Sequence, residues 1–137
     1  MNLLDFKKGM SFSYERKVLE SDVFEYAEIS GDRNPVHLDE TYAQKSTFGS
    51  RVAHGMLTAS FISKVFGMDF PGPGCIYLSQ TLKFKKPVYI NDTVTVNVEI
   101  IDINTDRSVV EFYTTCSVNG EIVLTGKAEI YIPRVDS

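Results

Sequence analysis

The chain has few of the residues that build metal centres and disulfide scaffolds. Its 137 residues include only two histidines and two cysteines. Cys75 and Cys116 lack a CxxC spacing, so reduced core thiols are expected rather than a disulfide or a zinc site. No metal is therefore expected. Because no GxGxxG motif or P-loop is present, no nucleotide cofactor is expected either.

An excess of positive charge and long hydrophobic runs are also missing. The net charge is -4, and a surface that follows nucleic-acid phosphates needs clustered Lys and Arg, so no nucleic-acid partner is expected. Residues 1–10 lack the apolar stretch of a signal peptide. The most apolar segment, residues 56–68, is too short to span a bilayer and carries Lys64. These observations predict a cytoplasmic protein with no membrane partner.

The length and composition suit one domain over residues 1–137, because 43% hydrophobic residues can fill a single core. A short strand is expected over residues 10–19. In the helix that follows, Ser21 offers an N-cap and Asp22 places negative charge in the first turn. Gly31 fits the left-handed position that ends a helix.

A loop and a second short helix are expected next. Residues 32–37 form the loop, because Pro35 lacks an N–H and pushes Asn34 towards extended geometry. Asp39 can cap a helix over residues 40–44. The loop and this helical segment are expected to overhang the rest of the domain.

Residues 56–68 are apolar nearly all the way round a helix, which predicts a buried helix. Four runs then alternate apolar and polar residues over 76–84, 94–100, 110–118 and 122–132. This period predicts antiparallel strands with one buried face. A strand, a buried helix and four more strands together predict an α+β hot-dog fold, in which an antiparallel five-stranded sheet wraps around a long central helix. Such a sheet has open edges, and pairing them across a dimer is one solution.

Asp32 stands five positions before His37 in the string from Tyr26 to His37. A carboxylate and an imidazole that are held together can bind one water molecule, polarise it and move its protons. On a helix this offset would point the two side chains apart, whereas a loop bent by Gly31 and Pro35 lets them converge. Simple turn duty is the alternative for either residue alone, but the complete string favours chemistry.

Three further residues are candidates for the same site. Asn34 can orient a carbonyl, a water molecule or a ligand, or serve only the turn. Gly55 stands at the N-terminus of the buried helix, where unpaired N–H groups and the helix dipole can stabilise a developing oxyanion; a plain tight turn is the alternative. His54 is expected to be structural. Ser63 can face a pocket, or bond to a carbonyl one turn back.

The remaining motifs are weaker. Lys83, Lys85 and Lys86 make the only basic cluster, which can meet ligand phosphates or form a solvated, edge-protecting face. A Ser-His-Asp hydrolase has little support because no GxSxG elbow is present.

The string Tyr26…Ile29-Ser30-Gly31-Asp32-Arg33-Asn34-Pro35-Val36-His37 resembles the hydratase motif of the MaoC-like, (R)-specific enoyl-CoA hydratases. The stretches over residues 52–57 and 76–88 also resemble this family. The resemblance covers nearly the whole chain in the right order.

The resemblance implies that the chain adds water to a trans-2-enoyl-CoA and forms the (R)-3-hydroxyacyl-CoA. Asp32 and His37 would be the catalytic pair, the Gly55 N–H the oxyanion donor, and Ser63 a pocket serine. The family implies an acyl-CoA thioester as substrate, no metal or redox cofactor, and a homodimer with CoA near the interface.

Other functions stay open at this point. A hot-dog thioesterase or a dehydratase acting on a carrier-protein substrate would use the same scaffold, and a non-catalytic acyl-CoA-binding subunit is an alternative of another class. Which of Asp32 and His37 is the base is also open, because a close pair titrates jointly. The acyl chain length depends on a pocket volume that the sequence does not contain.

Overall fold

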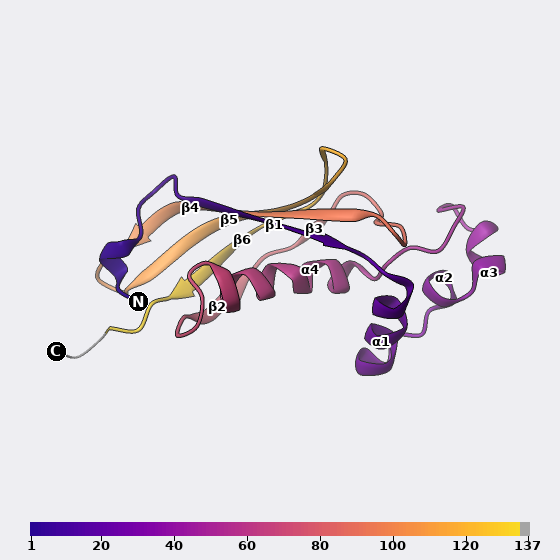
Figure 1. Ribbon diagram of the computed structural model, residues 1–137, viewed down its shortest axis with the longest axis horizontal. Helices are drawn as coiled ribbons and strands as arrows, with labels where there is room; N and C mark the ends of the chain where they lie inside the picture. The colour runs from indigo at the N-terminus through magenta and orange to yellow at the C-terminus, as the bar shows by residue number, and fades with distance from the viewer. Residues whose placement is uncertain (135–137) are drawn as a thin grey trace.

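The computed structural model describes residues 1–134, in which a long antiparallel sheet lies over one central helix (Figure 1). The sheet order is β1-β4-β5-β6-β2, and β3 also pairs with β6. The strands are β1 (Ser11–Lys17), β2 (Ile76–Gln80), β3 (Lys83–Phe84), β4 (Thr93–Asn104), β5 (Val109–Val118) and β6 (Glu121–Tyr131). The helices are a 3₁₀ turn (Leu3–Asp5), α1 (Glu20–Ser30), α2 (Pro35–Leu38), α3 (Glu40–Gln44), α4 (Gly55–Lys64) and a π-helical turn (Val65–Asp69). The expected α+β hot-dog architecture is confirmed.

Alternating apolar and polar residues form the face of the sheet that packs on the core. In β4 the residues Val94, Val96, Val98 and Ile100 are at most 1% exposed, while the side chains between them point away from the core. These residues form one hydrophobic core with the buried side of α4. The alternation in the sequence therefore predicted this face correctly.

The sheet has six strands rather than the expected five, because residues 76–84 do not form one continuous strand. The ladder is interrupted at Thr81, whose N–H donates to the Lys127 carbonyl at 2.8 Å and whose hydroxyl accepts from the Lys127 N–H at 2.9 Å. β2 ends before this point and β3 follows it. The Thr81 hydroxyl thus takes the place of a backbone carbonyl in the pairing with β6.

The apolar face that was expected to be buried in this segment is open within the chain. Ile76, Leu78 and Phe84 are 49%, 48% and 51% exposed. Because β2 lies at the edge of the sheet order, no further strand of the described chain covers it.

The expectation that the central helix is buried all round is also wrong for this chain alone. Leu57, Phe61 and Ile62 are buried against the sheet, but Met56 is 52% exposed and Ser63 is exposed too. The sheet covers one side of α4, so the other side stays uncovered.

The first helix begins at Glu20, two residues earlier than an N-cap at Ser21 implies, and Ser21 is not its cap. The Asp22 carboxylate accepts from the Leu19 N–H at 2.8 Å and pairs with Arg16 at 2.9 Å. The helix ends as predicted at Gly31, which has a φ of +80°. Asp39 also caps α3 as predicted, by accepting from the Tyr42 N–H at 3.1 Å.

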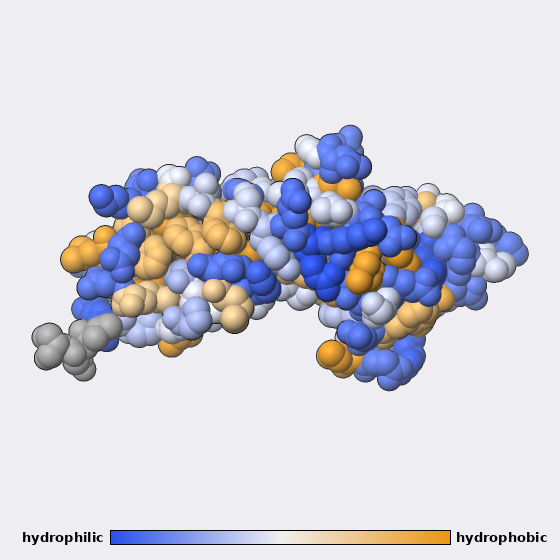
Figure 2. Space-filling view, in the orientation of Figure 1, coloured by the Kyte–Doolittle hydropathy of each residue, from blue (hydrophilic) through white to orange (hydrophobic). Residues whose placement is uncertain are grey.

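Helices α1, α2 and α3 form a lobe beyond the end of the sheet, beside the start of α4, and both termini lie at the opposite end (Figure 1). Figure 2 shows hydrophobic residues gathered towards the end that carries the termini, whereas the helical lobe is mostly hydrophilic. Within residues 1–134, no helix has the length and apolar character needed to cross a bilayer.

Candidate active site

Two histidine hydrogen bonds join the segment after α1 to the segment before α4. The Nδ1–H of His37 donates to the Val52 carbonyl at 2.7 Å, and the Nε2–H of His54 donates to the Asp32 carbonyl at 2.9 Å. The two rings stack with their centroids 3.8 Å apart. Because a carbonyl only accepts, these bonds place a proton on Nδ1 of His37 and on Nε2 of His54. His37 therefore presents a free lone pair on Nε2.

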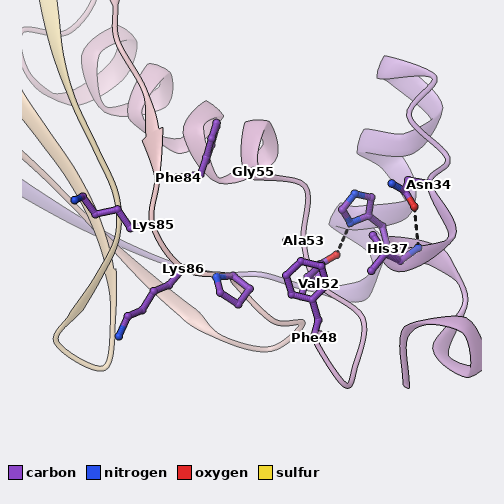
Figure 3. Close-up of a pocket in the computed structure, with 11 residues that line it drawn as sticks. Asn34, His37, Phe48, Val52, Ala53, Gly55, Phe84, Lys85 and Lys86 are labelled. Atoms are coloured by element: carbon purple, nitrogen blue, oxygen red, sulfur yellow. Dashed lines mark hydrogen bonds between the residues drawn. The ribbon is translucent and has the colours of Figure 1, made fainter. Parts of the chain in front are cut away.

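Local sequence determines where His37 points. The Asn34 side-chain oxygen accepts from the Val36 N–H at 3.2 Å, and Pro35 occupies the first position of α2, which tolerates the missing N–H. His37 thus lies in a one-turn helix and not in the expected open loop (Figure 3). The side-chain oxygen of Asn34 therefore stabilises the turn. Its amide nitrogen makes no such bond and can contact a ligand.

The Asp32 carboxylate converges on both imidazoles. One of its oxygens accepts from the Asn34 N–H at 3.1 Å, in the local turn. A carboxylate oxygen of Asp32 and a ring nitrogen each of His37 and His54 all lie within 4.8 Å of one another. One water molecule can bridge groups at this spacing. The structure therefore brings the two residues of the motif to a place where they can act on the same water.

Two imidazoles and a carboxylate are also a zinc-type ligand set, but their geometry does not fit a metal centre. A metal lies in the plane of each imidazole, about 2.0 Å from its nitrogen. The rings of His37 and His54 are stacked, with only 29° between their planes. One ion therefore cannot lie in both ring planes at bonding distance from both nitrogens.

His54 is a buried, uncharged partner of the pair. Its side chain is 2% exposed, and burial lowers its pKa. The Tyr26 ring packs near it, with the centroids 4.7 Å apart. Its Nδ1 is buried without a hydrogen-bond partner among the described residues, as a neutral ring allows. A neutral His54 avoids placing a second positive charge against His37 when His37 takes up a proton.

The first cavity opens beside His37 and has a volume of about 450 Å³. Asn34, His37 and Gly55 line it together with Phe84 (Figure 3). A Cβ on residue 55 would lie 2.7 Å from a ring carbon of Phe84. Glycine thus allows the close approach of the Phe84 ring, which would have to shift to admit a side chain at this position. Gly55 is the first residue of α4, where N–H groups lack partners within the helix.

Ser63 lines a different cavity, of about 530 Å³, with Tyr26, Met56, Tyr77 and Gln80. The expected grouping of Ser63 with Asp32 and His37 around one pocket therefore does not occur within the described chain. Burial raises the pKa of Tyr77 to about 12, and its hydroxyl donates to the Gln80 side-chain oxygen. Tyr26 lines this cavity and packs against His54, and His54 in turn stacks on His37, which lines the other cavity.

The chain belongs to the MaoC-like family. Residues 5–121 match the family model described as MaoC like domain.

Curated relatives and a solved structure agree with this membership. The chain is 47% identical to an (R)-specific enoyl-CoA hydratase of Rhodospirillum rubrum, over 94% of this chain and 90% of the relative. It is 45% identical to a 3-hydroxybutyryl-CoA dehydratase of Methylorubrum extorquens, over 95% and 83%. The structure of an R-hydratase from Pseudomonas aeruginosa superposes with a TM-score of 0.93 at 38% identity, over 98% of this chain and 86% of that one.

The buried state of His54 predicts a pH-dependent stability. An unfolded chain protonates His54 near its ordinary pKa of 6.5, whereas the folded chain resists protonation because the pKa is lowered. The free energy of unfolding should therefore fall as the pH is lowered from 7.5 to 5.5. His54→Gln, which keeps an amide donor for the Asp32 carbonyl, should lose part of this dependence. Urea unfolding of both proteins at both pH values measures it, and an identical change in the two proteins would contradict the prediction.

Proposed function

We propose that this chain is an (R)-specific enoyl-CoA hydratase. It adds water to a trans-2-enoyl-CoA, forms the (R)-3-hydroxyacyl-CoA, and also catalyses the reverse dehydration. The observation that supports this most strongly is the convergence of the Asp32 carboxylate and the free Nε2 of His37 beside a cavity that also contains the first residue of α4. In this proposal residues 1–137 act as one cytoplasmic hot-dog domain.

The reaction needs a base for water and an acid for carbon. Asp32 and His37 hold one water molecule between them, and one of the two accepts a proton as the water oxygen bonds to C3. The π electrons move towards the thioester oxygen, and C2 then receives a proton from the same pair. Because one water molecule and one pair of residues serve both steps, oxygen and hydrogen add to the same face.

The thioester oxygen gains negative charge as the water attacks. In this proposal the Gly55 N–H donates to it. Gly55 begins α4 and lines the cavity that contains His37, which supports this role. The positive end of the helix dipole adds to this stabilisation. Asn34 assists by orienting the turn that carries His37, and through its amide nitrogen.

The acyl chain enters the second cavity in this proposal. That cavity is lined mainly by apolar surface, and Tyr26, one of its lining residues, packs against His54. Ser63 positions the substrate there rather than at the reacting carbon. The volume of this cavity sets the range of chain lengths.

We further propose that the protein is a homodimer. The edge strand β2 exposes Ile76 and Leu78, and the uncovered side of α4 exposes Met56. Covering an apolar strand and helix side with a second copy buries this surface and satisfies the strand edge.

Disrupting the exposed apolar face should separate the dimer. Leu78→Glu puts a charge at a half-exposed position on β2, so we expect it to shift the protein to the monomer. Ile29→Glu is the matched control, because Ile29 is 87% exposed on α1 and outside this face. Light scattering after size-exclusion chromatography measures the mass. A wild-type monomer, or a dimer that survives Leu78→Glu, would contradict the proposal.

Removing either member of the pair should abolish most of the activity. With crotonyl-CoA as substrate, we expect Asp32→Asn and His37→Gln each to lower kcat by about 10²- to 10⁴-fold, the usual contribution of general acid-base catalysis. Loss of the enoyl absorbance follows turnover, and chiral analysis should find the (R) product. Asp39→Asn is the matched control, because asparagine also caps a helix, and it should retain activity.

Other outcomes of this assay would point to other functions. An (S) product, or near-normal turnover in both site variants, would remove the pair from the mechanism. Release of free thiol would instead identify a thioesterase. Binding of CoA esters without turnover would identify a non-catalytic subunit.

A further inference from the structure

The basic cluster Lys83, Lys85 and Lys86 is divided by the structure between different cavities. Lys83 lines a cavity with Thr125 and Gly126 on the sheet. Lys85 and Lys86 instead line the cavity that contains His37 and Gly55. A basic patch that appears uniform in the sequence therefore contributes only part of its charge to the active site.

The side chains that line the cavity beside His37 carry positive charge, although the chain as a whole is negative. Its lining includes two lysines and no aspartate or glutamate, although the whole chain carries a net charge of -4. Lys86 is already paired with Glu121 at 3.0 Å. Among residues 1–134, the Lys85 ammonium group forms no ion pair. Lys85 is therefore the cation that can meet an anionic ligand without a competing carboxylate.

The position of Lys85 suits an anion that lies away from the reacting bond. Its backbone N–H donates to the Val123 carbonyl at 2.8 Å, which anchors the base of the side chain to the sheet. The side chain extends on the side of the cavity away from His37 (Figure 3). In CoA the phosphates are separated from the thioester by the pantetheine arm, so a phosphate contact is needed at a distance from the reacting carbons.

We propose that Lys85 binds a phosphate group of the CoA moiety and thereby selects CoA thioesters over thioesters that carry no phosphate. This inference rests on the proposed hydratase function. Lys85 acts in substrate recognition and takes no part in proton transfer.

The test compares two substrates and three substitutions. Crotonyl-CoA carries the phosphates, and crotonyl-pantetheine lacks them. We expect Lys85→Ala to raise the KM for crotonyl-CoA by about two- to fivefold, the size of an exposed charge contact. The KM for crotonyl-pantetheine and both kcat values should stay unchanged. Lys85→Arg should restore the KM, and Lys83→Ala, the matched control, should behave as wild type.

The difference between wild type and Lys85→Ala should also shrink at high salt, because exposed charges are screened. Equal KM values for crotonyl-CoA in these two proteins would overturn the proposal. So would an equal loss on both substrates, or the same loss in Lys83→Ala.

A failure of the hydratase function itself is distinguishable. If the wild-type protein hydrates neither thioester, titration calorimetry with free CoA still measures the phosphate contact. Weaker CoA binding by Lys85→Ala than by Lys83→Ala would then support the contact, and equal binding would overturn it.

Discussion

The arrangement of the candidate site depends on a reciprocal pair of hydrogen bonds between two chain segments. His37, in the segment after α1, donates to the carbonyl of Val52, and His54, in the segment before α4, donates back to the carbonyl of Asp32. Asp32 is exposed and otherwise held only by its local turn. The cross-link therefore sets the distance between carboxylate and imidazole. It also determines which nitrogen of His37 can accept a proton, and it fixes the pair beside the start of α4.

The two parts of the proposed site differ in how they are held: one lies on short turns and the other on a helix packed in the core. Proton transfer is assigned to short turns and a one-turn helix, whose geometry depends on side-chain caps and the histidine bonds. Oxyanion stabilisation is assigned to the first residue of α4, which the core holds through Phe61 and Ile62 on the sheet. In the proposed mechanism, the first residue of this helix gives the thioester oxygen a fixed hydrogen-bond donor. The turns place the water molecule relative to that partner.

Local patterns in the sequence predicted much of this arrangement. Gly31, Asp39 and the alternation in β4 are encoded by turn, cap and period-2 chemistry, which act over a few residues. Alternation cannot reveal which partner covers an apolar face, and so the exposure of Leu78 in β2 was not predicted. The hydrogen bond from His54 to the Asp32 carbonyl could not be predicted from the sequence, because every residue has a backbone carbonyl. The separation of Ser63 from His37 depends on how α4 is rotated against the sheet.

In the proposed mechanism, one water molecule held between Asp32 and His37 serves both proton-transfer steps. Hydration of crotonyl-CoA in D₂O, followed by NMR analysis of the deuterium at C2 of the product, tests it most directly. A single shared water molecule predicts an (R)-3-hydroxyl with deuterium added to the same face of the double bond. Addition to opposite faces would require an acid and a base on two sides of the substrate, and it would contradict the account.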